Sequence, residues 1–439
     1  MTVGESIIYD NQVGIMTESI NLKEYEEKKE SELQGLDLVG FRNYLNRQKL
    51  SSVIDVYSDS IKSSQWVGVI KYKKTIIQIL PKLICDKDDN KTILKNLIYM
   101  LSFTKRLDIK TNEVAKLSKE KNPFMEILIR EFADSLFECL KRLTPQKYIR
   151  EENNLNYLKG KIKFSENIRY NCSNSAKFYC EYDEYSENNI LNQLFLFVST
   201  CLYSISNNNY NKKILKFITN YYADIDLICF DKVKAEKIKL SRNQEMFKKP
   251  FRLAKMFIEN ATVDLTKNRL ENIILLWDMN KLFEEFVFEL LKRNENKNGL
   301  EGWKFTAQKG KYLFKNNKDK FRMTNADIFA EKGKEKVIID TKYKKIETLK
   351  DVSNSDIFQV TTYCLLHNAT KGILLYPRWK EDNNKKEPFI LNTGRNDSKI
   401  NIDFKTIDLK QNDLKEELAK ENNEIIKGLK GLLKIPQSC

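Results

Sequence analysis

The feature that most constrains this 439-residue sequence is a pair of strand-like segments on either side of a short turn, in residues 324–345 (TNADIFAEKGKEKVIIDTKYKK). Residues 326–330 and 337–343 are strand-like, and Gly333-Lys334 between them is typical of a two-residue hairpin turn. That turn places Asp327 directly opposite Asp340, with Cβ atoms roughly 4.5–5.5 Å apart. The sequence therefore predicts a hairpin with two facing carboxylates.

A lysine completes this group. Side chains two residues apart on a strand share a face, so Lys342 joins Asp340. Two adjacent carboxylates repel each other, and hard divalent cations such as Mg²⁺ accept oxygen ligands of this kind. An ammonium beside such a site suits metal-assisted phosphodiester hydrolysis. A solvated hairpin with a cross-strand Asp–Lys pair is the alternative. The apolar run 337–339 before Asp340 predicts a buried strand, which favours a functional reason for the charges.

Two predicted helices flank the hairpin. Residues 281–293 (KLFEEFVFELLKR) have one apolar face, and Asn280 is a candidate N-cap. Glu284 on this helix supplies a third carboxylate. After the hairpin, Gln359 and Tyr363 lie four residues apart and share one helix face. The order helix, hairpin, strand, helix, with Glu, Asp, Asp-x-Lys and Gln-x-x-x-Tyr, resembles the PD-(D/E)-x-K nuclease core.

Longer segments resemble the McrC family, the nuclease subunits of modification-dependent restriction systems. The similar blocks are LFEEFVFELL, NADIF with VIIDTKYK, DIFQVTTY, WVGVIKYKKTIIQILPKLI, and LKGKIKF followed by CEYDEYSENNILNQLF. They cover most of residues 66–380, and their joint occurrence is specific although each block alone is weak. One departure is visible, because Ala326 stands where the family motif has Pro. That Pro stiffens the strand and supplies no ligand.

The resemblance implies a role for each site residue. Asp327, Asp340 and Glu284 would bind Mg²⁺ (or Mn²⁺), and Lys342 would orient or activate the attacking water. Glu284 and Gln359 would also support catalysis. Glu285 is the competing choice to Glu284 on the same helix.

The resemblance also implies partners, a McrB-like hexameric AAA+ GTPase ring and double-stranded DNA. The sequence contains no G-x-x-x-x-G-K-[ST] motif, which agrees with a separate GTPase. The candidate for the ring-engaging element is residues 160–182, a finger-like stretch with basic residues around a polar tip. An ordinary exposed hairpin is the alternative. The basic residues are Lys161, Lys163, Arg169 and Lys177.

The predicted fold class is α/β, an α+β multidomain chain. Residues 1–265 are predicted to form a mixed α/β region that binds the partner, and residues 266–439 an α/β/α nuclease domain. The other predicted elements are two strands in 66–80, a helix from Asn122-Pro123, two strands within 158–190, a helix over 190–205, a weakly structured segment 234–250 and a tail helix over 413–434.

Composition limits the chemistry. His367 is the only histidine, which excludes multi-histidine metal sites, and its place suggests a structural or helix-end residue. The eight cysteines form no C-x-x-C pair, and their apolar surroundings fit a reducing cytosol. No apolar run approaches the ~18 residues of a membrane span. The net charge of +15 fits a partner with phosphates.

Two other functions remain open from the sequence. A catalytically silent scaffold with the nuclease fold would bind DNA and activate the motor. A stand-alone repair nuclease of the same fold would cut DNA without any GTPase.

Overall fold

The computed structural model describes most of the chain. The described residues are 18–33, 35–82, 89–109, 123–264, 269–315, 320–346, 348–378, 389–391, 400–411, 413–420 and 423–433.

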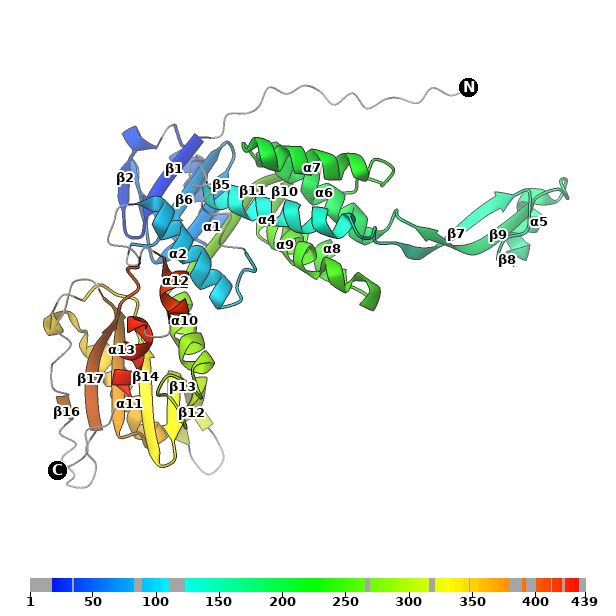
Figure 1. Cartoon of the computed structure of the whole chain (residues 1–439). Coiled ribbons are helices and arrows are strands. Elements are labelled where there is room, and N and C mark those ends of the chain that lie inside the picture. The colour runs from blue at the N-terminus through cyan, green and yellow to red at the C-terminus, as the bar shows by residue number, and fades with distance from the viewer. Residues whose placement is uncertain are drawn as a thin grey trace. The chain divides into compact units, whose positions relative to one another are not determined.

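The chain forms two compact units, and neither is continuous in sequence (Figure 1). Unit 1 comprises Met1–Glu18, Ile70–Ile76 and Glu120–Leu275. Unit 2 comprises Ser19–Val69, Ile77–Lys119 and Leu276–Cys439. The division predicted after residue 265 therefore lies about ten residues before the last boundary. Two early segments, Ser19–Val69 and Ile77–Lys119, belong to the same unit as the C-terminal region, whereas the sequence predicted them in the N-terminal region.

The N-terminal strands form a three-stranded sheet in the order β2-β4-β3 and part of a five-stranded sheet in the order β1-β6-β5-β11-β10. The last two strands of that sheet, β10 Ala261–Asp264 and β11 Arg269–Asp278, come from later in the chain. The two strands predicted in residues 66–80 are confirmed as β5 and β6. The turn between them includes Lys73, whose φ is 52°. The elements are β1 Glu18–Lys23, β2 Glu27–Lys29, η1 Glu30–Glu32, α1 Leu38–Arg47, β3 Ile54–Val56, β4 Ser60–Ser63, β5 Trp66–Tyr72, β6 Thr75–Leu80 and α2 Asn90–Phe103.

The middle of the chain is largely helical. A helix starts at Pro123 as predicted, although its expected N-cap, Asn122, lies outside the described residues. The predicted helix over 190–205 is also confirmed. The elements are α4 Pro123–Leu140, α6 Ile190–Ile205, α7 Asn209–Tyr221, α8 Lys232–Lys237, η3 Arg242–Phe247, α9 Lys248–Glu259, β10 Ala261–Asp264 and β11 Arg269–Asp278.

The prediction of a weakly structured segment over 234–250 was wrong. This segment contains the end of α8, all of η3 and the start of α9. Pro250 is the third residue of α9, where a backbone N–H has no partner within the helix, so the proline does not interrupt it. Behind it, Phe251, Ala254 and Phe257 are buried at helical spacing.

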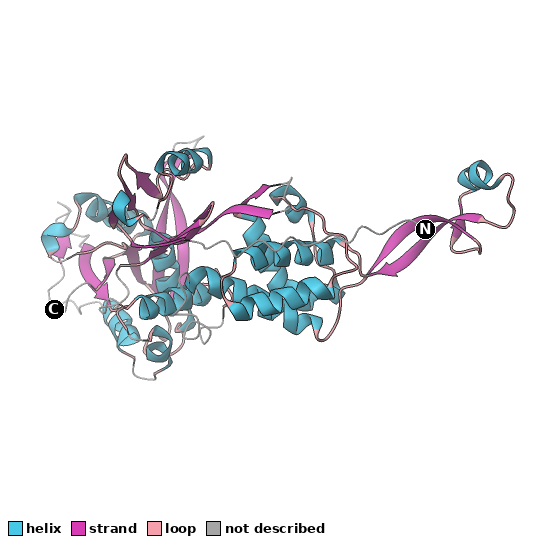
Figure 2. Cartoon of the chain, turned by 90° about the horizontal axis from the view of Figure 1, so that it is seen from above, coloured by secondary structure: helices cyan, strands magenta, loops and turns pink. Residues whose placement is uncertain are grey.

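A finger projects from the helices of unit 1 (Figures 1 and 2). Its strands are β7 Lys147–Leu155, β8 Lys161–Ile162 and β9 Phe178–Ser186, in the order β7-β9-β8, and α5 Phe164–Asn171 lies at its far end. The prediction of two strands joined by a polar connection was therefore wrong for its first half. There the chain forms only a two-residue strand and then α5, whose Phe164 and Ile168 are exposed and so gave no core pattern.

The C-terminal region is built on a six-stranded sheet in the order β12-β13-β14-β15-β17-β16. Strands β12, β13 and β14 are antiparallel, whereas β14, β15 and β17 are parallel. The elements are α10 Met279–Arg293, β12 Lys304–Lys315, β13 Lys320–Lys332, β14 Glu335–Thr341, η4 Leu349–Asp351, α11 Asn354–His367, β15 Lys371–Pro377, β16 Phe389–Leu391, β17 Ile400–Ile407, α12 Leu414–Ala419 and α13 Glu424–Leu432.

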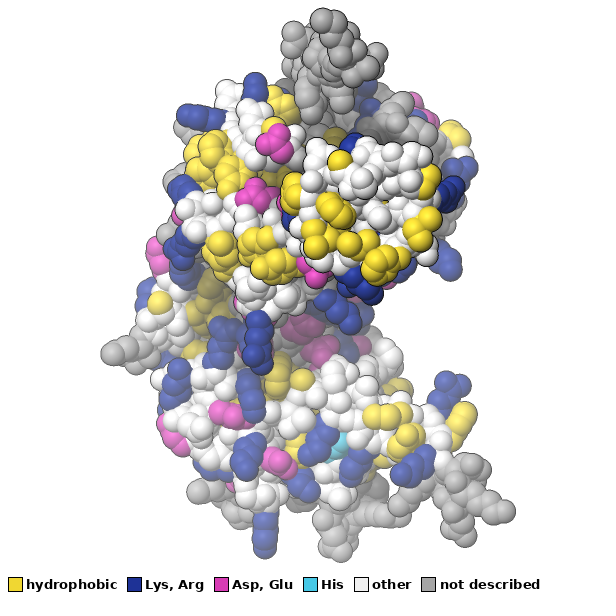
Figure 3. Space-filling model, turned by 90° about the vertical axis from the view of Figure 1, so that its right-hand side faces the viewer, with side chains coloured by type: hydrophobic (Ala, Val, Ile, Leu, Met, Phe, Trp, Pro, Cys, Tyr) yellow, Lys and Arg dark blue, Asp and Glu magenta, His cyan; other side chains and the backbone are white. Residues whose placement is uncertain are grey.

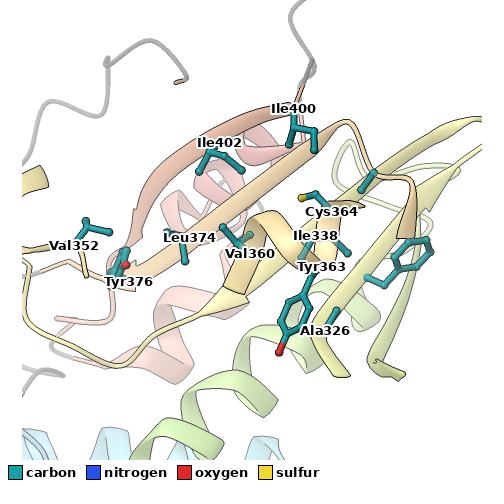
Figure 4. Close-up of a cluster of buried hydrophobic side chains, with 12 residues drawn as sticks. Ala326, Ile338, Val352, Val360, Tyr363, Cys364, Leu374, Tyr376, Ile400 and Ile402 are labelled. Carbon is teal, nitrogen blue, oxygen red and sulfur yellow. The ribbon is translucent and has the colours of Figure 1, made fainter. Parts of the chain in front are cut away.

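Helix α11 packs on this sheet through a buried apolar cluster (Figure 4). Val360 and Cys364 of the helix meet Ile338 and Leu374 of the strands there. Every residue of β15 is buried, as expected for a central parallel strand covered on both faces. His367 ends α11 and is buried against Phe329, with ring centroids 5.4 Å apart, which confirms a structural, helix-end histidine.

Two helix predictions in this region need correction. The N-cap of α10 is Asp278, whose carboxylate accepts a hydrogen bond from the backbone N–H of Asn280 at 2.9 Å, so Asn280 is not the cap. The tail forms two helices instead of one, because Asn423 caps α13 by accepting a hydrogen bond from the Ile426 N–H at 2.7 Å. Among the described residues, no helix is long and apolar enough to cross a membrane.

Candidate active site

The β13–β14 hairpin has the register that its turn predicts. Ile328 pairs with Ile339, and Lys332 pairs with Glu335 beside the turn at Gly333. The next position along each strand is Asp327 and Asp340, so the two carboxylates lie where the ladder ends. The predicted register of the hairpin is confirmed.

Asp327 is anchored by the end of β14. Its Oδ2 accepts hydrogen bonds from the backbone N–H of Thr341 at 2.9 Å and from the Thr341 hydroxyl at 3.1 Å. Burial raises the pKa of Asp327 above its ordinary value, while the Thr341 hydrogen bonds and the charge of Lys342 act in the opposite direction. These two hydrogen bonds fix the position of Oδ2 at the end of β14.

Asp340 is completely buried, and neighbouring groups only partly neutralise its carboxylate charge. Its Oδ2 lies 2.7 Å from the Lys342 ammonium, and its Oδ1 has no hydrogen-bond partner. Burial, followed by the charge of Asp327, raises the pKa of Asp340 to about 7. An unsatisfied carboxylate in a protein interior costs free energy unless a cation or a proton neutralises it. Asp340 thus has a buried carboxylate oxygen whose charge a cation or a proton can neutralise.

Lys342 is held between the hairpin and α11. Its ammonium donates to Oε1 of Gln359 at 3.2 Å in addition to its ion pair with Asp340. The Gln359 amide in turn donates to the Tyr363 hydroxyl at 2.9 Å. The predicted pair on one face of α11 is therefore confirmed, and it fixes the position of the lysine.

Glu284 faces the same group from α10. The pKa of Glu284 is raised to about 7, mainly by burial and then by the charge of Asp327. The charge of Lys342 opposes this rise only in part. Its Oε1 accepts a hydrogen bond from the Gln308 amide of β12. Gln308 was missed by sequence reasoning. Its φ of 49° is rare for a residue other than glycine and marks an irregularity in β12 beside the site.

Glu285, the competing choice, points elsewhere. It forms a two-pronged ion pair with Arg106, with N–O distances of 2.7 Å and 2.5 Å. The geometry thus separates the two glutamates: Glu284 is directed towards Asp327 and Lys342, and Glu285 towards the segment after α2.

The residues present suit a divalent cation. Asp327 and Asp340 offer oxygen ligands, and Oδ1 of Asp340 is buried without a partner. Within the part of the chain that the structure describes, no three His, Cys, Asp or Glu side chains are already grouped closely enough to hold a metal. A cation here would therefore take two carboxylates and complete its shell with other oxygens, as Mg²⁺ commonly does with water.

A second buried acid, also missed from the sequence, lies behind the site. Glu24 follows β1 and accepts a hydrogen bond from the Tyr343 hydroxyl at 3.1 Å and from the Lys82 N–H at 2.9 Å. Tyr343 follows Lys342 directly, and its ring lies 5.8 Å from that of Phe283, the residue before Glu284. Complete burial raises the pKa of Glu24 to about 8.

Residues 61–377 match the family described as McrBC 5-methylcytosine restriction system component. The chain belongs to this family. The match spans more than half of the sequence and includes the hairpin, α10 and α11. No curated protein matches this sequence.

Two solved structures resemble this chain. One is the refined half-complex from the tetradecameric assembly of Thermococcus gammatolerans McrB AAA+ hexamers with bound McrC. It has a TM-score of 0.73 and 22% identity, over 94% of this chain and 99% of the other. The other is the cryo-EM structure of the Thermococcus gammatolerans McrBC complex. It has a TM-score of 0.53 and 25% identity, over 63% of this chain and 88% of the other. The predicted mixed α/β fold is confirmed.

Proposed function

We propose that this chain is the Mg²⁺-dependent (or Mn²⁺-dependent) DNA endonuclease subunit of a McrBC-like, GTP-dependent restriction system. Its substrate is foreign or modified double-stranded DNA. The observation that carries the proposal is the buried Asp340 beside Lys342, with Asp327 on the adjacent strand. The flanking helices bring Glu284 and Gln359 to the same group, in the order of the PD-(D/E)-x-K core. Membership of the McrBC family supports the restriction role.

Each residue has a physical task in this proposal. Asp327 and Asp340 hold the cation, and Glu284 completes its surroundings. A bound Mg²⁺ supplies Lewis-acid charge at the scissile phosphate. The Lys342 ammonium orients the attacking water and adds positive charge for the phosphorane-like transition state. Gln359 keeps the ammonium in position through its 3.2 Å hydrogen bond.

We also propose that the chain works with an AAA+ GTPase ring and stimulates it. One of the similar structures is of McrB AAA+ hexamers with bound McrC, and the other is of a McrBC complex, which supports this partner. The finger of unit 1 suits the contact. Its far end exposes Tyr157, Leu158, Phe164, Ile168 and Tyr170. Figure 3, viewed from the side towards which the finger projects, shows such hydrophobic side chains on the nearest part of the surface.

Reconstitution distinguishes this proposal from its alternatives. The purified chain is incubated with modified and unmodified DNA, with and without the candidate GTPase and GTP. The proposal expects cleavage of the modified DNA only in the complete mixture. Cleavage by the chain alone would favour a stand-alone nuclease. Activation of the GTPase without any cleavage would favour a silent scaffold.

A further inference from the structure

Strands β12 and β13 continue beyond the active site as a two-stranded ribbon. Their pairing runs from Lys304 opposite Glu331 to Lys315 opposite Lys320. The pairing of β13 with β14 reaches only Ile328. Residues 309–315 and 320–326, called the ribbon below, therefore pair only with each other within the described part of the sheet. The ribbon starts one residue from Asp327.

The ribbon carries positive charge without negative charge. Lysine or arginine occupies five of its fourteen positions, and Asp and Glu are absent from both segments. Lys320 and Arg322 are exposed, and each lies against an aromatic ring, at 5.4 Å from the Tyr312 centroid and 5.2 Å from the Phe321 centroid. Such an arrangement keeps the cationic groups outside while their stems cover apolar surface.

The ribbon also exposes large apolar side chains. Phe314 is 57% exposed, Phe321 60% and Met323 58%, and the two phenylalanine rings pair across the strands at 6.4 Å. An exposed apolar patch on a two-stranded ribbon marks an interaction site. Figure 3 shows Lys and Arg side chains beside hydrophobic ones over the lower part of the molecule, which contains the six-stranded sheet.

The size of the ribbon fits a groove of duplex DNA. Phe321 lies six residues from Asp327 along β13, about 20 Å at ~3.3 Å per residue. The major groove is about 12 Å wide and admits a two-stranded β-ribbon. A duplex with its scissile phosphate at Asp327 and Asp340 would meet the cationic groups and the exposed aromatic rings if it ran along the ribbon.

We infer that the ribbon is a DNA-binding arm that grips the duplex beside the scissile phosphate. The arm holds the substrate independently of the metal site, through Lys320 and Arg322 to phosphates and through Phe314 and Phe321 to the groove. This inference rests on the proposed function, because it takes DNA as the substrate of the adjacent site.

The test measures binding of the full-length chain to a fluorescent 30-base-pair duplex in EDTA, over a range of salt concentrations. Lys320→Glu/Arg322→Glu is expected to weaken binding at least about tenfold and to lower the slope of log K against log salt by about 2, at ~0.9 per lost phosphate contact. Phe314→Ser/Phe321→Ser is expected to weaken binding about three- to tenfold with the slope unchanged. The matched control, Lys297→Glu/Lys334→Glu, makes the same change of charge at exposed positions off the ribbon.

Two outcomes would overturn the inference. One is wild-type binding by both ribbon variants. The other is a change in sedimentation coefficient with unchanged DNA binding, which would assign the ribbon to contact with a second copy of the chain. Asp340→Ala separates this inference from the proposed function, since it should bind DNA normally in EDTA yet fail to cleave. Cleavage by that variant would refute the proposed catalytic site but would not contradict DNA binding by the ribbon.

Discussion

The Lys342 ammonium lies 2.7 Å from Oδ2 of Asp340, a carboxylate with no solvent exposure. The pair links the end of β14 to α11, because Lys342 also donates to Gln359. A buried charge pair of this kind contributes little net stability compared with apolar residues. A buried charge pair at this position therefore calls for a chemical reason, which the neighbouring Asp327 supplies.

Lys342→Met is expected to reduce DNA cleavage by about 100-fold or more, because it removes a positive charge aimed at the transition state. Lys344→Met is the matched control. Lys344 pairs with Asp356 at 3.0 Å and its side chain is 50% exposed, so its loss should leave cleavage within about threefold. Cleavage rates under single-turnover conditions report both effects. Equal cleavage rates for the two variants would show that Lys342 has no role in catalysis.

Glu284→Gln and Glu285→Gln form a second matched pair on one helix. Glu284→Gln should lower cleavage about 10- to 100-fold and raise the Mg²⁺ concentration needed for half-maximal rate. Glu285→Gln loses only its ion pair with Arg106, which is partly exposed, so the rate should stay near that of the wild type. A larger loss for Glu285→Gln than for Glu284→Gln would reverse the assignment.

Glu24 makes stability depend on pH. Its pKa is about 8 in the folded chain and near 4.5 when unfolded, so the folded state keeps a proton that the unfolded state releases. The free energy of unfolding therefore falls as pH rises from 4.5 to 8, by up to a few kcal/mol. Glu24→Gln should reduce this slope and raise the melting temperature most above pH 8. Thermal melts between pH 5 and 9 test this, and parallel profiles for variant and wild type would contradict it.

Gly372 sets the approach of α11 to β15. A Cβ at this position would lie 2.9 Å from Cys364 Sγ, 2.9 Å from Ile402 Cδ1 and 3.0 Å from Val360 Cγ2. Gly372→Ala should therefore destabilise the fold by about 1–3 kcal/mol through overpacking. Urea denaturation followed by circular dichroism measures the change. Gly428→Ala, where a Cβ meets nothing within 4 Å, is the control.

Local patterns predicted the hairpin well. The register of β13 and β14 followed from the turn at Gly333-Lys334 and from side-chain alternation, which are properties of adjacent residues. The pairing of Gln359 with Tyr363 followed from helix geometry in the same way.

Contacts between distant segments could not be predicted. Arg106 selects Glu284 over Glu285 for the site from 179 residues away, and Tyr343 meets Glu24 across 319 residues. Gln308 joins Glu284 through a backbone irregularity that no propensity predicts. In the finger, α5 was missed because its apolar residues face outward, so the usual core stripe is absent.

In the proposed function, cleavage of DNA depends on Asp327, Asp340 and Lys342. The most direct test is single-turnover cleavage of modified duplex DNA by Asp340→Ala with the GTPase partner, GTP and Mg²⁺ present. Far-UV circular dichroism and partner co-purification confirm that the variant is folded and assembled. The account predicts no cleavage above background, with GTP hydrolysis and partner binding retained. Metal-dependent cleavage at the wild-type rate would contradict it.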